Sequence, residues 1–325
     1  MKRTRTLIAL TASLIAFAIG LSLTTSSANA SVKSATPKLK LLWSQEFNNQ
    51  RKLYPDSKVW NFDLGNNGGW GNNENEYYTA SNAITQGICP TTLGYKVKTT
   101  DQRVCIKSKA ANKTAIGALN IFAKKIPGDD IAAASCAACM YFSARLNTKN
   151  KVSFRYGKLE ARIWMPRGDG TWPAFWLLGR NIDQKNWPAS GEIDIVEGGR
   201  DAYTAIGTTH GPHRFGADGI TNGGYAHTTA LSAGWHNYGL IWTPSYLEWT
   251  FDGISYFKLT KSEMMNTYDE TWTGVFDQPF FLIINLAMGG WFVGGSPDPN
   301  ITTASLKFDW IRYHSYNGYG TLYKR

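Results

Sequence analysis

Short stretches in which apolar and polar residues alternate follow one another along most of this chain, separated by Gly, Asn, Asp and Pro. The clearest is Leu247 to Leu259, LEWTFDGISYFKL, which predicts two strands joined at Asp252-Gly253, a pair that tight hairpin turns prefer. Four more runs read as strands: Gly157 to Met165, Tyr238 to Trp242, Pro279 to Asn285 and Ser305 to Tyr313. Long helical periodicity, internal repeats and Pro- or Ser-rich linkers are missing. The pattern therefore predicts an all-β antiparallel sandwich or jelly roll.

The first thirty residues have the layout of a secretory signal peptide. Lys2, Arg3 and Arg5 precede a mostly apolar run from Leu7 to Leu23, and Ala28-Asn29-Ala30 is a small-residue cleavage site. A retained membrane anchor is the alternative, but polar residues dilute the run below what a spanning helix needs. We expect residues 1–30 to be removed as a signal peptide, residues 31–40 to form a flexible lead, and residues 41–325 to form one domain. The mature protein should be secreted and should not be attached to the membrane.

Charge adds little to this picture. The chain carries 34 basic and 24 acidic residues, and loss of the signal removes three of the basic ones, leaving 31. This excess is mild and forms no dense block, so we expect no nucleic-acid partner. The sequence does not reveal the oligomeric state, and a monomer is the default expectation.

Four cysteines lie between residues 85 and 140, a region that reads as an elaborated loop: Cys89, Cys105, Cys136 and Cys139. An even number of cysteines in an exported protein suits two disulfides, although three pairings are possible. The alternative is a four-cysteine metal site, of which the C-x-x-C at Cys136 would be half. We favour disulfides, with Cys89 joined to Cys105.

Three acids crowd one predicted strand, GEIDIVEGG. Glu192 and Asp194 share a face because side chains alternate with period two, whereas Glu197 is out of phase with them. One β-bulge at Ile195 or Val196 would reset the alternation and bring all three carboxylates to one face.

Such acids have three interpretations. They could be ordinary charges on a solvated strand, they could bind calcium, or they could be the carboxylate pair of glycoside hydrolysis. No Lys or Arg alternates with them, and like charges on one face repel. Most of the 13 tryptophans are expected in the core of a sandwich. Four of them stand beside Gly, Asn or Pro and would suit stacking on sugar rings: Trp70, Trp172, Trp187 and Trp291.

Six motifs, in order over most of the chain, resemble glycoside hydrolase family 16, and in particular its laminarinase-like endo-β-1,3-glucanases. WPASGEIDIVEGG, from Trp187 to Gly199, resembles the family's bulged E-x-D-x-x-E signature. The other five are LLWSQEFN (41–48), GWGNNENEYYT (69–79), YGKLEARIWMPRGDGTWPAFWLLG (156–179), NLAMGGWFVGG (285–295) and FDWIRYHSY (308–316).

This resemblance implies a concanavalin-like jelly roll of two curved antiparallel sheets with an open substrate cleft. It also implies an endo-acting enzyme that hydrolyses β-1,3-glucan with retention and needs no cofactor for catalysis. Glu192 matches the nucleophile, Glu197 the acid/base and Asp194 the acid between them. Trp172 and Trp187 match positions that line the sugar sites, and Asn73, Glu160 and Arg162 match polar cleft positions.

Further positions carry over less directly. His210 lies where the family often has a histidine beside the acid/base, although a lone histidine is usually structural, and Trp291 is a further candidate for the cleft. The resemblance also implies a structural calcium ion on the convex side, in the region of Glu46 and Asp309.

Departures from the family pattern leave the substrate open. Asn75 and Glu76 stand where the laminarinase pattern usually has Leu and Gln, and the region 85–140 has no recognised counterpart. Mixed-linkage glucanases, galactan hydrolases and transglycosylases share the scaffold, and a glucan-binding lectin is the rival from another class. The presence of all three acids favours an enzyme.

Overall fold

The hairpin predicted around Asp252-Gly253 is present. β15 (Tyr246–Phe251) and β16 (Ile254–Thr260) pair antiparallel, with Phe251 opposite Ile254. The two turn residues have φ values of 48° and 81°. Positive φ at both positions of a two-residue loop is the geometry that matches the twist of the flanking strands, and Asp-Gly tolerates it.

The other four predicted strands are also confirmed, each within a few residues of its expected ends. They are β9 (Gly157–Trp164), β14 (His236–Trp242), β17 (Phe280–Met288) and β18 (Thr303–Tyr316). This computed structural model describes residues 36–47, 54–85, 117–127, 136–168, 170–216, 219–228 and 230–325. The predicted signal at 1–30 lies outside them, as do most of the predicted lead and both Cys89 and Cys105.

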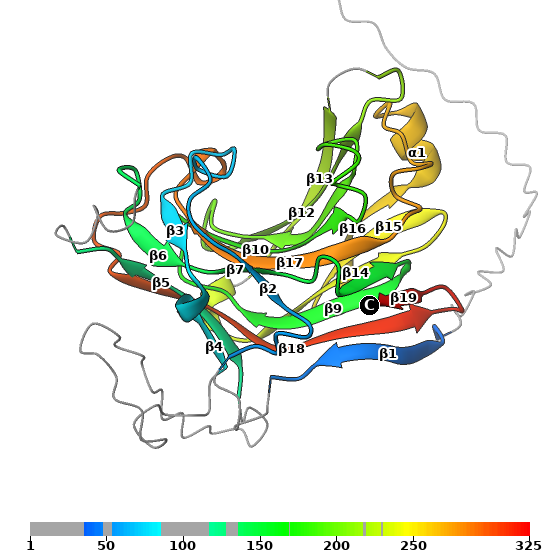
Figure 1. Ribbon diagram of the computed structural model, residues 1–325. Helices are drawn as coiled ribbons and strands as arrows, with labels where there is room; N and C mark the ends of the chain where they lie inside the picture. Colours follow the sequence, from blue (N-terminus) through cyan, green and yellow to red (C-terminus); the bar gives the residue numbers. More distant parts are fainter. Residues whose placement is uncertain are drawn as a thin grey trace, which may run out of the picture. The chain divides into compact units, whose positions relative to one another are not determined.

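Two sheets stack face to face within the compact unit Pro37–Arg325 (Figure 1). In the first, the strand order is β16-β15-β14-β9-β18-β5-β6-β3, with β1 also paired to β18 and β4 to β5. We call it the β9–β18 sheet. Its remaining strands are β1 (Leu39–Gln45), β3 (Glu76–Tyr78), β4 (Ala83–Thr85), β5 (Leu119–Lys125) and β6 (Tyr141–Ser143).

The second sheet has the order β13-β12-β11-β10-β17-β7-β2, with β8 paired to both β17 and β19. We call it the β10–β17 sheet. Its strands besides β17 are β2 (Asn61–Asp63), β7 (Arg145–Asn147), β8 (Val152–Arg155), β10 (Thr171–Gly179), β11 (Glu192–Glu197), β12 (Thr204–Pro212), β13 (Gly219–His227) and β19 (Thr321–Lys324). Every pairing in both sheets is antiparallel except that of β3 with β6.

The core fills the space between the sheets. Leu159, Ala161 and Ile163 of β9 point into it, because they alternate with half-buried neighbours along the strand. β17 is buried along its whole length, which fits a central strand covered on both faces. Five of the 13 tryptophans are buried in the core, so the expectation that most of them serve the core is wrong: Trp43, Trp60, Trp242, Trp249 and Trp272.

Helical structure is minor. The α-helix α1 (Lys261–Asn266) begins at Thr260 with a capping box, in which Thr260 and Glu263 each bind the other's backbone N–H. Three short 3-10 segments complete the described part: η1 (Ala80–Asn82), η5 (Leu231–Ala233) and η6 (Trp291–Val293). Among the described residues, no helix has the length and apolar character to cross a bilayer.

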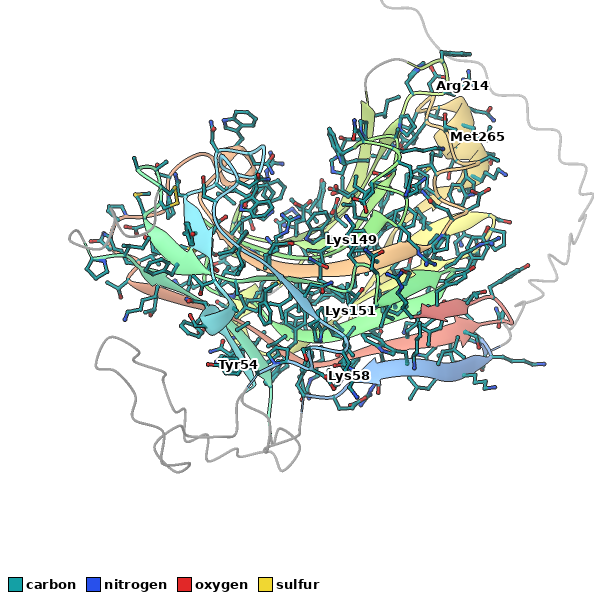
Figure 2. The ribbon with its side chains drawn as sticks, in the orientation of Figure 1. Tyr54, Lys58, Lys149, Lys151, Arg214 and Met265 are labelled. Carbon is teal, nitrogen blue, oxygen red and sulfur yellow. A yellow bond between two sulfur atoms is a disulfide. The ribbon has the colours of Figure 1, made fainter. Side chains whose placement is uncertain are left out.

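Long polar side chains connect loops to one another and to the helix. Lys151, which follows β7, donates to the carbonyl oxygens of Ser57 and Trp60, and the labelled Lys58 lies close by (Figure 2). At the far end of the molecule, Arg214 donates to the carbonyl of Met265 in α1 (Figure 2).

The region from 85 to 140 contains more regular structure than the sequence predicts. Leu119, Ile121 and Ala123 of β5 are fully buried between the sheets, so this stretch is a core strand rather than a loop. Cys136 and Cys139 form a disulfide, which agrees with disulfide chemistry in place of a metal site at these two residues. The pairing of Cys89 with Cys105 stays a prediction.

Candidate active site

A bulge in β11 brings the three acids to one face, as the phase of the sequence predicts. Asp194 lies opposite Thr208 and Glu197 opposite Ile206, so Ile195 and Val196 together face the single residue Gly207. The register with β10 also shifts at this point. Both bulge residues belong to the core between the sheets. The carboxyl groups of Glu192, Asp194 and Glu197 consequently lie on the outer face of the β10–β17 sheet.

Glu197 is held by two neutral donors. The indole Nε1 of Trp172 donates to its Oε1 over 3.0 Å, and the hydroxyl of Thr208 donates to its Oε2 over 3.3 Å. The residue is 8% exposed. The predicted sugar-site residue Trp172 therefore lies directly against the predicted acid/base.

Glu192 is contacted by Trp187 and His210. Trp187 is 54% exposed, and its Nε1 donates to Glu192 Oε2 over 3.0 Å. His210 is the cross-strand partner of Glu192 and places its Nε2 3.7 Å from Glu192 Oε1 and 3.3 Å from Asp194 Oδ2. The histidine predicted beside the acid/base thus has its closest contacts with the other two acids.

Burial changes the titration of all three carboxyls. It raises the pKa of Glu192 and Asp194 well above their ordinary values, and the negative charge of the neighbouring acids adds to the effect. Burial also raises the pKa of Glu197, while the hydrogen bond from Trp172 opposes that rise. A cluster of this kind keeps a proton at pH values where isolated carboxyls have lost theirs, so it combines a proton donor with an ionised group.

One aromatic contact at this face went unnoticed in the sequence. Phe292 of η6 stacks on Trp172, with ring centroids 4.8 Å apart. The guanidinium of Arg200 lies over the Phe292 ring, 5.1 Å from its centroid. The charge of Arg200 lowers the pKa of Glu197. The neighbouring Trp291 is 68% exposed, but it makes no ring contact with the acids among the described residues.

Arg145 is a second residue that the sequence gave no reason to select. Its guanidinium lies 4.6 Å from the Trp70 ring centroid and 4.9 Å from that of Trp176. It is also paired with Asp63 at 3.0 Å, and its charge lowers the pKa of Glu192. An isolated arginine in β7 has no motif around it, so only the fold reveals its place among these rings.

Next to this arginine lies a buried pair of acids, Glu74 and Glu76. Met288 donates its backbone N–H to Glu76 over 2.7 Å, and Tyr78 donates its hydroxyl to Glu74 over 3.3 Å. Burial and mutual repulsion raise the pKa of Glu76 well above its ordinary value, and burial raises that of Glu74. Asn73, predicted to line the cleft, precedes this pair in a loop with a φ of 56°, and no contact of its side chain with the three acids is found among the described residues.

The predicted cleft positions Glu160 and Arg162 are not part of this site. Both lie on β9 and alternate with the core residues Leu159, Ala161 and Ile163, so their side chains leave the opposite side of the sandwich. There Glu160 pairs with Lys158 at 2.8 Å, and Arg162 pairs with Asp309 at 2.8 Å. The prediction came from matching motif positions of the family, and it is wrong because β9 belongs to the other sheet and these two side chains leave that sheet on the side away from the acids.

The acids expected near a structural calcium ion are engaged with arginines. Both carboxylate oxygens of Glu46 accept hydrogen bonds from Arg312, at 3.0 and 2.8 Å, and Asp309 accepts one from Arg162. Calcium requires free carboxylate or carbonyl oxygens, and a guanidinium at each acid opposes a cation. In this arrangement the two residues do not fit a calcium site, and the calcium ion stays a prediction.

Comparison with known proteins agrees with the geometry of the acid cluster, because the matches are to glycoside hydrolases. The family described as "Glycosyl hydrolases family 16" matches residues 95–312. A protein of Niallia circulans named "Glucan endo-1,3-beta-glucosidase A1" is 31% identical over 85% of this chain, which spans only 38% of that relative's length. A protein of Rhodothermus marinus named "Beta-glucanase" is 31% identical over 86% of both proteins.

The fold has a solved counterpart. The laminarinase catalytic domain from Thermotoga maritima superposes with a TM-score of 0.66 at 35% identity, covering 85% of this chain and 98% of that domain. The two-sheet architecture is therefore the jelly roll that the sequence predicts, with the acids on the outer face of one sheet.

Proposed function

The chain belongs to glycosyl hydrolases family 16 and is a glycoside hydrolase, and from this premise we propose that it cleaves internal bonds of β-1,3-glucan with retention of configuration. The substrate class is supported by the names of the relatives, and the reaction class by the acid cluster itself. The observation that carries the proposal is the bulge between Asp194 and Glu197, because it alone puts all three carboxyls on one face.

In the first step, the carboxylate of Glu192 attacks the anomeric carbon while the carboxyl of Glu197 gives its proton to the departing glycosidic oxygen. A covalent glycosyl-enzyme forms and the glycosidic bond breaks. In the second step, water gives a proton to Glu197, its oxygen attacks the anomeric carbon, and Glu192 leaves as a carboxylate. Both acids end in the state in which they began.

The surrounding side chains support this division of roles. The indole N–H groups of Trp187 and Trp172 each donate to one of the two glutamates, which fixes the direction of each carboxyl. Asp194 lies between them on the same face, and its negative charge adds to the raised pKa of Glu192. A protonated Asp194 would donate a hydrogen bond to Glu192 and keep the charge of the cluster low.

The exposed rings suit a sugar polymer. Trp187 presents more than half of its surface to solvent beside the predicted nucleophile, and Trp172 offers its ring edge beside the predicted acid/base. Sugar rings have apolar C–H faces, so aromatic side chains at both ends of the acid cluster can hold the units on either side of the cleaved bond.

Reducing-end release from laminarin, barley mixed-linkage glucan, agarose and carrageenan tests the proposal. We expect preferential release from laminarin, and loss of at least a thousandfold in kcat for Glu192→Gln. Glu248→Gln is the matched control, because Glu248 lies on β15 and is paired with Lys258, away from the acids. Proton NMR of the first product should show the β-anomer before mutarotation.

Other outcomes would change the conclusion. Stronger release from mixed-linkage glucan or a galactan would move the substrate within the family, and formation of longer oligosaccharides would indicate transglycosylation. Binding of laminarin without hydrolysis by the wild-type chain would favour a glucan-binding lectin on the same scaffold.

We also propose that the chain is exported, that Ser31 is the first residue of the mature protein, and that the mature protein is a monomer. The charged start, the apolar run and the Ala28-Asn29-Ala30 site support export. N-terminal sequencing of the protein from culture medium tests the cleavage site, and light scattering tests the monomer.

A further inference from the structure

We propose that Glu192, Asp194 and His210 form a binding site for a divalent transition-metal ion of the zinc type, and that the bound ion switches the enzyme off. The metal binding stands on the geometry alone, whereas the inhibition rests on the proposed function. The three side chains offer one ligand atom each, and all three atoms lie within 4.8 Å of one another.

Two of the three distances between ligand atoms are close to those around a tetrahedral ion. Bonds of about 2.0–2.2 Å to nitrogen and oxygen require neighbouring ligand atoms to lie roughly 3.3–3.6 Å apart. His210 Nε2 lies 3.3 Å from Asp194 Oδ2 and 3.7 Å from Glu192 Oε1. Small side-chain rotations would therefore complete two edges of the tetrahedron, and the backbone would not need to move.

The ligand atoms stand on paired strands, which makes their spacing a property of the sheet. Glu192 and His210 are directly opposite each other in the β11–β12 ladder, and Asp194 lies two residues further along the same face. Cross-strand partners of this kind have adjacent side chains. The site is thus assembled before any ion arrives.

One buried oxygen lacks a partner. Asp194 is 3% exposed, and its Oδ2 accepts no hydrogen bond from any residue in the described part of the chain. That oxygen faces His210 Nε2. A buried carboxylate oxygen without a donor is costly, and a cation placed between it and the imidazole would satisfy both.

A residue behind the histidine favours the metal-binding form of the ring. Thr221 of β13 places its Oγ1 2.8 Å from His210 Nδ1. When Nδ1–H donates to this hydroxyl, the lone pair of Nε2 is directed towards the acids. Metal-binding histidines almost always have such a partner on the other nitrogen, which fixes both the tautomer and the ring orientation.

The ligand set selects the ion. One imidazole and two carboxylates suit zinc and its first-row neighbours, whereas calcium and magnesium prefer sites built from oxygen alone. An ion held here would occupy the carboxylate that attacks the sugar and would fix the acid beside it. Hydrolysis would stop without any change elsewhere in the fold.

Isothermal titration with zinc chloride tests the binding without any substrate. We expect one zinc ion per wild-type chain, a loss of affinity of at least tenfold in His210→Asn, and a loss of about 10–100-fold in Thr221→Val, whose side chain keeps the shape of threonine. His213→Asn is the matched control, because His213 follows the same strand but faces Asp269 at 3.5 Å. It should bind zinc like the wild type.

The zinc affinities of the variants and the position of the ion in a crystal decide whether the site exists. Equal zinc affinity in His210→Asn and wild type, or no zinc binding by the wild type, would overturn the proposal whether or not the chain hydrolyses laminarin. Anomalous scattering from a zinc-soaked crystal should place the ion between the three residues, and a peak elsewhere would count against the site.

Inhibition is measured separately, with each variant compared with its own metal-free rate. Zinc should inhibit wild-type hydrolysis at the concentrations at which it binds, while magnesium and calcium at the same concentrations should not. If zinc binds at these residues but hydrolysis continues unchanged, the inhibitory role is wrong and the metal site remains.

Discussion

The indole Nε1 of Trp172 lies 3.0 Å from Glu197 Oε1, and the same indole ring stacks on Phe292 at 4.8 Å. One side chain of β10 therefore orients the predicted acid/base and is itself packed against a residue of η6. This arrangement couples the protonation of Glu197 to the packing of η6, because a donor held in place stabilises the ionised carboxyl.

Trp172→Phe should reduce kcat/KM by roughly tenfold to a hundredfold, since a hydrogen bond to an ionised group contributes about 1.5–3 kcal/mol. It should also move the alkaline limb of the pH profile upward. The indole lowers the pKa of Glu197, so its removal raises that pKa and keeps the acid protonated to higher pH. A full profile of kcat/KM between pH 4 and pH 10 measures both effects, and an unchanged alkaline limb would contradict this role.

Trp187→Phe should affect the opposite limb. Trp187 donates to Glu192, which must be ionised to attack, so loss of the donor disfavours the ionised form and moves the acid limb upward. The two variants make the same chemical change at the two ends of one cluster. Movement of the same limb in both would indicate that the roles of Glu192 and Glu197 are not separated as proposed.

The bulge shows what local sequence can predict. Two apolar residues between Asp194 and Glu197 predict it from alternation alone, and the register confirms it. The Asp252-Gly253 turn is predictable for the same reason, because turn chemistry is local. By contrast, β5 follows a region with no clear pattern, and its strand character comes from pairing with β18 and β4, which lie far away in sequence.

The error over Glu160 and Arg162 comes from carrying over family positions, and the omissions at the site come from the lack of a local motif. Glu160 and Arg162 carry the right chemistry but face away from the acids, while Arg145 and Phe292 lie at the site without a local motif. Which sheet a strand joins, and which of its faces is covered, is decided by contacts between distant segments. Alternation in one strand contains no such information.

Glu76→Gln should widen the alkaline range of stability. Glu76 is fully buried beside Glu74, and burial raises its pKa well above the ordinary value. The folded chain therefore binds more protons than the unfolded chain above pH 4.5, so stability falls as pH rises through the folded pKa. Glutamine resembles the protonated acid and can accept the hydrogen bond from Met288. The Tm of Glu76→Gln should therefore fall less than that of the wild type between pH 6 and pH 10.

Glu76→Ala is the contrasting variant. It leaves the N–H of Met288 without its buried acceptor, which costs about 1–3 kcal/mol, and opens a cavity beside Tyr78. Its Tm should be lower than that of the wild type at every pH. If Glu76→Gln loses as much stability as Glu76→Ala at pH 6, Glu76 is ionised there and its pKa is not raised as described.

β13 pairs with β12 along its whole length, and the buried acid Glu270 adds a side-chain contact to it. Glu270 is fully buried, and the side-chain amide of Asn222 donates to its Oε2. Asn222 is the buried member of an otherwise exposed or half-buried strand, so this contact is an anchor for β13 in addition to its ladder with β12. The adjacent residue, Thr221, contacts His210, and the anchor thereby helps to position the histidine at the acids.

Burial raises the pKa of Glu270 to about 8. Because the unfolded value is 4.5, the folded chain holds an extra proton between these two pH values, and the stability supplied by protonated Glu270 is lost progressively as pH rises through this window. Glu270→Gln keeps an acceptor for Asn222 and cannot ionise. Its Tm should match that of the wild type at pH 5 and exceed it at pH 9. Calorimetry at both pH values measures the difference, with Glu248→Gln as the control at a half-buried acid paired with Lys258. Parallel curves for wild type and Glu270→Gln would show that Glu270 does not titrate in this range.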